Sequence, residues 1–386
     1  MYNLETIIEE SIARALSSSA DSYREQGEFQ KAKELYLKAL KLKESLSEID
    51  AERYQALIAK TLDALALVSK EENDAGSAVE YYSKSILITE ELYQSMPTEY
   101  IDVLLKRYVD IANLYRRYDY YGEAERFYNK ALNIYKSLSE EDFAESQTKV
   151  LNIYHYLSII CTARDKFQEA KSAYIGALDI YNHLVEDEGD YRAERAMVLY
   201  ELASLCFKHK QQNRAGEFYL LALKLLSKLY RDERDKYQAL LASTFHHLGQ
   251  IYTVQHEYKA GLMAYKESLK HYIALAEKNP SEYGSYVTIL FENLASFYRQ
   301  QNNIELAQYF HLKVVDLYTE LKDYNESVYA LKLASAIIEG VEYYQQHTLG
   351  LYQAEAMIQG YRGACQTADL LDKIYALRQE KKIVLS

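Results

Sequence analysis

Small residues recur along the chain at a nearly constant interval, and large apolar residues keep fixed distances from them. The intervals are 46, 46, 46, 45, 46 and 46 residues, and the members of this column are Ala20, Ala66, Ala112, Ser158, Ala203, Gly249 and Ala295. Leu or Ile precedes the small residue in six of the seven copies. A period of this length indicates a repeat architecture in which each unit is one supersecondary element.

Further columns follow each small residue at fixed distances and have helical spacing. A second small residue stands twelve positions later, and four positions beyond it stands Tyr in six copies and His311 in the seventh. Ala215, Tyr219 and Ala222 show the i, i+4, i+7 spacing of one helix face. Between the two small-residue columns, turn-forming residues occupy the same position of the repeat in five copies: Gly27, Asn73, Asp119, Asp165 and Asn302. Each repeat is therefore predicted to be two helices of about 20 residues joined by a short turn.

Both prolines of the chain fall at the same phase of this repeat. Pro97 stands in the string PTEY and Pro280 in the string PSEY, each fifteen residues before a small residue of the first column. Ser and Thr are favoured immediately before a helix because their hydroxyls accept from free backbone N–H groups. We therefore expect helices to start here, with Thr98 and Ser281 as N-caps.

The repeat motif resembles that of the tetratricopeptide repeat (TPR) family. The first copy matches the family pattern with Leu16, Ser19, Ala20, Tyr23, Gly27, Ala32, Tyr36 and Ala39. The resemblance covers roughly residues 5–325. The usual unit of the family has 34 residues, so twelve additional residues lengthen both helices, as in bacterial arrays with an Asn-Pro-x-x-Tyr linker, matched here at 279–283. The resemblance implies an all-α, right-handed α-solenoid of antiparallel helix pairs, a TPR superhelix.

The pattern changes toward the C-terminus. We predict seven repeats of about 46 residues in 1–325, a degenerate eighth repeat in 326–360, and a capping helix with a tail in 361–386. Leu370, Leu371, Ile374 and Leu377 give the stretch 368–377 an amphipathic pattern. Terminal repeats need such a helix to cover their last apolar face, and docking of a partner is the alternative role.

Composition excludes several classes of protein. Only 2 Pro and 13 Gly occur in 386 residues, too few for the many turns of a β-sandwich. The net charge of −12 argues against nucleic acid as a partner. Three widely spaced Cys predict a reducing compartment, and the acidic start MYNLETIIEES lacks a signal-peptide pattern. With no apolar stretch long enough for a membrane span, we expect a cytoplasmic protein.

No motif for catalysis or cofactor binding occurs, so we predict a protein that is not an enzyme and needs no cofactor or metal. Cys161 and Cys206 occupy the same repeat column and fit small core positions, with a redox pair as the alternative. His246 and His247 are adjacent and point about 100° apart on a helix, so spacing alone does not make them a zinc site. An enzyme using His246 with a nearby carboxylate is the remaining catalytic hypothesis.

The resemblance further implies that the first helix of each repeat lines a concave groove. The candidate groove residues are Lys60, Lys106, Asn113, Arg116, Arg117, His155, Ile159, Tyr200, Phe207 and His246. The cations give repeats 2 and 3 a basic lining, and the later residues give repeats 4 to 6 an aromatic and apolar lining. Such grooves use charge-assisted contacts and aromatic anchors. We therefore expect an acidic segment at the basic part and an apolar anchor at Ile159, Tyr200 and Phe207.

An alternative role of these cations is pairing with Glu and Asp on adjacent helices. The carboxylate clamp that some TPR proteins use for chaperone tails is not matched, because Val109 stands where a Lys is expected and only Asn113 fits.

The function expected first is a non-enzymatic scaffold or adaptor that binds a partner protein or peptide, with self-association left open. The alternative is a peptide-sensing regulator of a bacterial signalling system, similar in size to the Rap-type regulators. Those proteins carry an N-terminal helical bundle, whereas the repeat columns here begin by about Leu16. RNA binding by helical repeats is opposed by the period and the acidic charge.

Overall fold

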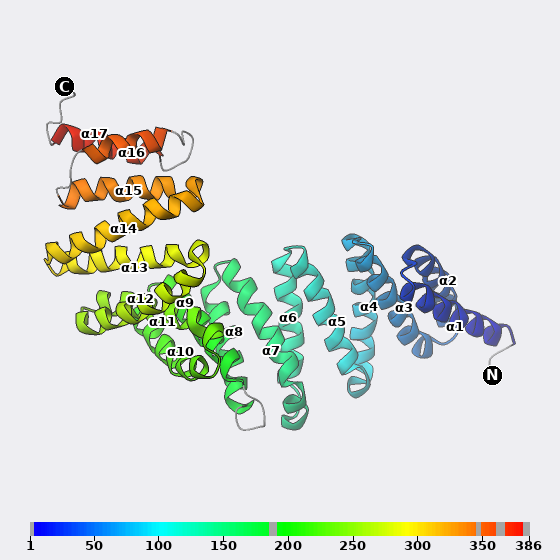
Figure 1. The fold of residues 1–386 in the computed structure, drawn as a ribbon. Helices are drawn as coiled ribbons and strands as arrows, with labels where there is room; N and C mark the ends of the chain where they lie inside the picture. Colours follow the sequence, from blue (N-terminus) through cyan, green and yellow to red (C-terminus); the bar gives the residue numbers. More distant parts are fainter. Residues whose placement is uncertain (1–3, 185–190, 345–348, 360–366, 381–386) are drawn as a thin grey trace. The chain divides into compact units, whose positions relative to one another are not determined.

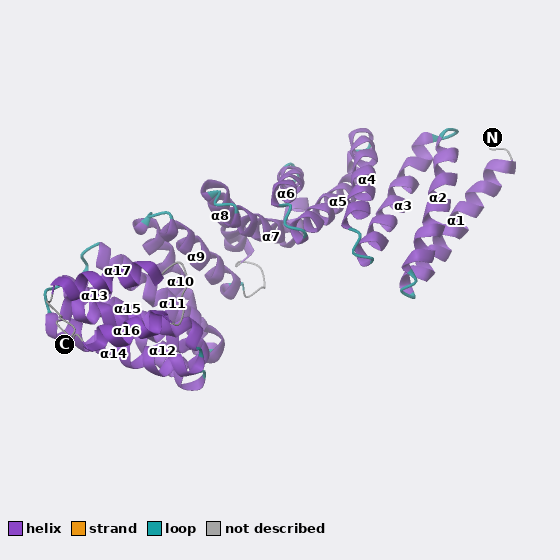
Figure 2. Cartoon of the chain, turned by 90° about the horizontal axis from the view of Figure 1, so that it is seen from above, coloured by secondary structure: helices purple, strands orange, loops and turns teal. Residues whose placement is uncertain are grey.

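The computed structural model describes residues 4–184, 191–344, 349–359 and 367–380, and every element in these ranges is an α-helix (Figures 1 and 2). The chain divides into two compact units, residues 1–182 and 183–386. None of the described helices combines the length and the apolar character that crossing a membrane would require.

The first unit is a row of consecutive helices, in which each helix from α1 to α7 packs against its neighbours in the chain (Figure 1). Their bounds are α1 Leu4–Glu25, α2 Phe29–Ser47, α3 Ala51–Glu71, α4 Ala75–Ser95, α5 Pro97–Arg117, α6 Tyr121–Lys136, α7 Glu140–Ala163 and α8 Phe167–Leu184. Each repeat contributes two of these helices, joined by a tight turn. Helix α8 lies close to α7 at Gly176, where an added Cβ would lie 2.4 Å from Cζ of Tyr154.

The second unit continues the same pairing. Its helices are α9 Arg192–Lys208, α10 Gln212–Asp232, α11 Arg234–Val254, α12 Tyr258–Lys278, α13 Pro280–Gln300, α14 Ile304–Tyr324, α15 Glu326–Tyr344, α16 Leu349–Gln359 and α17 Thr367–Glu380. The last of them, α17, packs against both α15 and α16. Ile374 and Leu377 of α17 are buried in one cluster with Leu351 and Ile358 of α16.

The core consists of the small-residue columns and the rings of two Tyr columns. Ala20, Ala66, Ala112 and Ala203 have no exposed surface, which lets neighbouring helices approach closely. Among the largest fully buried side chains are Tyr36, Tyr54, Tyr128 and Tyr219. Three of these hydroxyls bond to side chains on the first helices of repeats: Tyr36 to Asp21, Tyr54 to Glu10 and Tyr128 to Asn113. The rings thus fill the core while these three hydroxyl groups are satisfied at its edge.

The turn within each repeat is closed by one residue in the left-handed region. These residues are Gly27, Asn73, Asp119, Asp165, Lys210, His256 and Asn302, with φ between 55° and 77°. In the first turn, the N–H of Gly27 bonds to the carbonyl of Arg24 and the N–H of Glu28 to that of Tyr23. This pattern ends a helix by satisfying its last carbonyls. Five of the seven positions were predicted, and Lys210 and His256 were not.

The predicted N-caps at the two prolines are wrong. Helix α5 begins at Pro97 with Met96 as its N-cap, and α13 begins at Pro280 with Asn279 as its N-cap. Pro is favoured at the first helical position because its missing N–H would have no partner there and its φ already suits the helix. Thr98 and Ser281 therefore lie inside the first turn.

Candidate functional site

The first helices of the repeats are α1, α3, α5 and α7 in the first unit and α9, α11, α13 and α15 in the second. We call the side-chain surface that they present in each unit its first-helix face. Polar contacts on this face join α1 to α3 and α3 to α5 in the first unit, and α9 to α11 and α11 to α13 in the second, between residues 43 to 47 positions apart. The contacts are Glu10 with Arg53 and Tyr54, Asp63 with Arg107, Tyr200 with Ser243, and His246 with Asn293.

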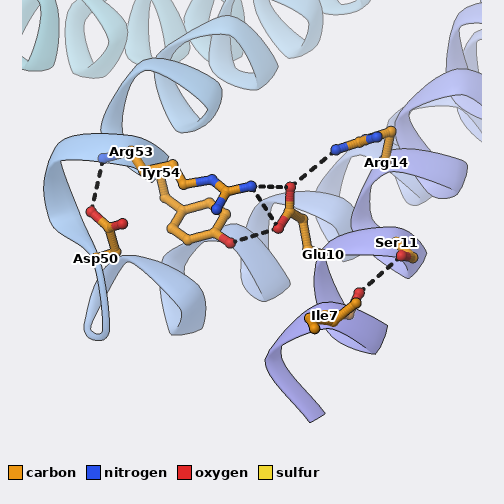
Figure 3. A network of polar contacts seen from close by, with 7 residues as sticks. All are labelled: Ile7, Glu10, Ser11, Arg14, Asp50, Arg53 and Tyr54. Carbon is orange, nitrogen blue, oxygen red and sulfur yellow. Dashed lines mark hydrogen bonds and ion pairs between the residues drawn. The ribbon is translucent and has the colours of Figure 1, made fainter. Parts of the chain in front are cut away.

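A pocket of about 310 Å³ lies between α1, α2 and α3. At its edge, Arg53 and Tyr54 of α3 and Arg14 of α1 converge on the carboxylate of Glu10 (Figure 3). The distances from the Glu10 oxygens are 2.8 Å to Arg53 Nη2, 3.0 Å to Arg14 Nη2 and 3.1 Å to Tyr54 Oη. The carboxylate of Glu10 is thus already held by two guanidinium groups and a phenol.

The wall of this pocket contains Lys43 of α2, whose residue is only 8% exposed. Its Nζ donates to Oγ of Ser17 at 2.9 Å and to Oγ1 of Thr61 at 2.7 Å. Among the described residues no carboxylate lies within ion-pair distance of Nζ. Burial, with a smaller contribution from the charge of Lys60, lowers the pKa of Lys43 to about 8. We call this cavity the Lys43 pocket.

A second pocket, of about 450 Å³, lies between α3, α4 and α5 and contains two of the predicted cations, Lys60 and Lys106. It also contains Arg107, which is 5% exposed and whose Nη2 lies 2.6 Å from Oδ2 of Asp63. Two further carboxylates, Asp102 and Asp110, line the same space. Burial raises the pKa of Asp110, against the opposing charge of Lys106. The lining predicted to be basic is therefore mixed, with three cations and three carboxylates.

The remaining predicted residues of the first unit lie on α5 and α7. Oδ1 of Asn113 accepts from the Tyr128 hydroxyl at 2.6 Å. The guanidinium of Arg116 lies 4.3 Å from the ring centre of Tyr156, and Arg117 is exposed. His155 and Ile159 are also exposed, Ile159 with 45% of its surface. Within the described ranges, no ion pair to Asp or Glu is formed by any of the four predicted cations Lys60, Lys106, Arg116 and Arg117.

In the second unit the structure brings three predicted residues into one aromatic cluster, centred on His247. The His247 ring stacks on Tyr219 at 5.1 Å and lies 5.5 Å from Phe207 and 6.1 Å from Tyr200. The neighbouring ring of His246 lies 5.5 Å away. We call these five residues the aromatic cluster. The third predicted anchor, Ile159, belongs to the first unit.

The two histidines of the cluster both have a pKa below the ordinary value for the residue. Burial lowers the pKa of His246 to about 4, with a smaller contribution from His247, and burial also lowers the pKa of His247. Nε2 of His246 lies 2.8 Å from the Asn293 amide nitrogen. Over the part of the chain that the structure describes, no three His, Cys, Asp or Glu side chains form a group that could hold a metal ion.

Sequence reasoning missed the two buried cations, Lys43 and Arg107. A signal for Lys43 exists in its repeat column, where it is the only charged member: Lys43, Thr89, Tyr135, Tyr181, Leu226, Tyr272 and Tyr318. A charged residue at a core position of a repeat requires a polar partner from a neighbouring helix.

Comparison with known proteins concerns the fold of the chain. The family model of the tetratricopeptide repeat matches residues 13–46, which lie in α1 and α2. No curated protein sequence gives a significant match.

Among solved structures, the apo form of RapI is 13% identical, with 96% of this chain and 98% of RapI covered and a TM-score of 0.50. BtubC from P. vanneervenii is 24% identical, with 64% of this chain and 92% of BtubC covered and a TM-score of 0.40. YrrB, a TPR protein with an unusual peptide-binding site, is 16% identical, with coverage of 62% and 98% and a TM-score of 0.37.

The similarity to RapI extends over nearly the whole of both chains and concerns the fold. It agrees with the sequential antiparallel helix pairs, and the family model lies on the first of those pairs. The columns of that first repeat recur at intervals of 45 or 46 residues through six further copies. The chain therefore has the fold of a tetratricopeptide repeat array.

Proposed function

We propose that this chain is a non-enzymatic scaffold or adaptor that binds a partner protein or peptide along its first-helix faces. TPR domains generally bind proteins or peptides, and their stacked repeats leave an extended surface for this purpose. The assignment of the binding site to the first helices rests on the exposed cations and aromatic side chains that these helices carry.

The observation that carries the proposal is the state of three exposed cations, Lys60, Lys106 and Arg117. Each lies on a first helix, and none forms an ion pair with a carboxylate in the described ranges. Exposed cations that form no ion pair are available for an acidic segment of another chain, and contacts between opposite charges both speed association and select the partner. Lys60 and Lys106 share their pocket with Asp63, Asp102 and Asp110, and of these carboxylates Asp63 is already paired with Arg107.

The second unit supports the same proposal with different chemistry. Tyr200 and Phe207 remain partly exposed while their rings contact His247. Aromatic side chains of this kind supply a large contact area at a small cost in conformational entropy, and they are enriched at binding hot spots. An apolar side chain of the partner is expected to pack on them.

The test is a charge-reversal variant, Lys60→Glu with Lys106→Glu and Arg117→Glu. A matched control reverses three exposed lysines of second helices, Lys38, Lys41 and Lys224, so that net charge changes equally. Both variants are compared with the wild type in quantitative capture from cell lysate, after circular dichroism has shown equal helix content. We expect one or more proteins to be retained by the wild type and the control and lost from the first-helix variant. Equal recovery by all three proteins contradicts the assignment to this face.

A sensor of short peptides is the second candidate. Two pockets beside first helices of the first unit measure about 310 and 450 Å³, which suits individual side chains or a short peptide. A sensor is expected to change hydrogen exchange in helices remote from its peptide, whereas a scaffold is expected to change it only in the helices that touch the partner. Hydrogen exchange with and without a bound acidic peptide separates the two functions.

A further inference from the structure

Two neighbouring repeats build the same three-residue contact from different residues. In the first contact, Lys43 of α2 lies between Ser17 of α1 and Thr61 of α3. The residues 46 positions further on form the second contact, and they are Thr89 for Lys43, Asp63 for Ser17 and Arg107 for Thr61. There, Arg107 donates to Thr89 and forms an ion pair with Asp63.

Each contact therefore contains one buried cation, but only the second contains a carboxylate. Ser17 occupies the position in the first contact that Asp63 occupies in the second, so the first contact has no negative charge. A buried charge without a counter-ion is strongly unfavourable. An ammonium group has three donors, and the two hydroxyls account for two of those of Lys43.

The carboxylates that line the Lys43 pocket are engaged elsewhere. Glu10 is held by Arg53, Arg14 and Tyr54. Asp21 accepts from the Tyr36 hydroxyl at 2.5 Å. The lining contains the three cations Arg14, Lys43 and Lys60 against these two carboxylates, so the pocket has a positive excess.

We propose that the Lys43 pocket binds a ligand carboxylate, which takes the place that Asp63 occupies in the next repeat. Beside Ser18 and the rings of Tyr36 and Tyr54, the lining contains four apolar residues, Ala13, Leu46, Leu57 and Ala64. The group attached to the carboxylate is therefore small and mainly apolar. The volume of about 310 Å³ is near the lower end for ligand pockets. A short aliphatic acid, the end of a peptide and an acidic side chain share this chemistry.

This inference deepens the proposed function by naming the chemistry at one end of the first-helix face, and its test does not require the macromolecular partner. The full chain is labelled with [13Cε]lysine, and the Lys43 signal is identified as the one absent from Lys43→Met. Butyrate is the probe, inorganic phosphate is the comparison anion, and Lys41, an exposed lysine on the same helix, is the control signal.

We expect butyrate to move the Lys43 signal in a saturable manner and to leave the Lys41 signal nearly unchanged. Ser17→Asp copies the next repeat and supplies an internal carboxylate. It is expected to lower the affinity for butyrate at least about tenfold, because the ligand then loses a charge-assisted bond. This variant keeps Lys43 and is expected to fold, since the same arrangement is accommodated at Asp63 and Arg107.

Two peptides distinguish the sources of the carboxylate. One ends in a free carboxylate and has no acidic side chain, and the other is amidated at its end and contains one Glu. If the shift of the Lys43 signal saturates only with the first peptide, the carboxylate is that of a chain end. If it saturates only with the second, the carboxylate is that of a side chain, and saturation by butyrate alone identifies a free small acid. A Lys43 signal that does not saturate with any of the three, equal binding by Ser17→Asp, or equally tight binding of phosphate overturns the proposal.

Discussion

Replacing Lys43 by Met removes a buried positive charge while keeping a side chain of similar length. The pKa of Lys43 is lowered from 10.5 to about 8, and each pH unit corresponds to about 1.4 kcal/mol. Burying this ammonium therefore costs the folded state about 3 kcal/mol at pH 7 relative to an exposed lysine.

The same substitution also removes two hydrogen bonds, worth about 1 kcal/mol each. The hydroxyls of Ser17 and Thr61 keep their own bonds to the carbonyls of Ala13 and Leu57, so neither is left without a partner. Without added ligand, Lys43→Met is thus expected to be about 1 kcal/mol more stable than the wild type at pH 7, whereas the loss of an ordinary core contact would destabilise the protein.

The difference reverses at high pH. Between pH 8 and 10.5 the unfolded chain binds more protons at this position than the folded protein, so the stability of the wild type rises with pH. The charged groups near Nζ are Lys60, which lowers its pKa, and Asp21, which raises it. Most of the about 3 kcal/mol is regained by pH 10. The wild type is then expected to exceed Lys43→Met by about 1 to 2 kcal/mol.

The assay is urea unfolding followed by circular dichroism at pH 7, 8, 9 and 10, and the quantity compared is the difference between variant and wild-type midpoints at each pH. Lys41→Met is the control, since Lys41 is exposed on the same helix. Differences that stay constant across this pH range for Lys43→Met, or that change equally for Lys41→Met, would refute the reasoning.

Two further substitutions test the packing. Arg107→Met leaves the carboxylate of Asp63 without its buried partner and is expected to cost about 3 kcal/mol. Arg126→Met removes an exposed ion pair and is expected to cost less than about 1 kcal/mol in the same urea assay. Gly249→Ala places a Cβ 2.6 Å from Cδ1 of the buried ring of Tyr265, and a loss of about 1–3 kcal/mol is expected. A neutral thermal midpoint for Gly249→Ala would mean that the ring moves aside without cost.

The fold was predictable because the close approach of helices requires a small residue at the same position of every repeat. Small residues stand wherever two helices meet, so the spacing of Ala20, Ala66 and Ala112 indicates the architecture without any other information. The turns were predicted only where the residue itself favours the left-handed region. Lys210 and His256 carry no such preference, although both stand at the phase of the other five turns.

The candidate site was predictable only in part, because its decisive contacts join different repeats. The predictions placed Lys60, Lys106 and Tyr200 on first helices, as the structure has them. The partner of a buried cation, however, comes from a neighbouring helix and differs between copies. Lys43 of α2 bonds to Thr61 of α3, whereas Arg107 of α5 bonds to Thr89 of α4. The buried cation thus stands on a second helix in one contact and on a first helix in the other, and no single repeat column contains both.

The polar contacts between first helices span no more than 47 residues of sequence. Chains with such local contacts lose little loop-closure entropy when each contact forms, and they fold quickly. A repeat needs only its immediate neighbour in order to bury its core. The first helix pairs can therefore acquire their structure while the rest of the polypeptide is still being synthesised.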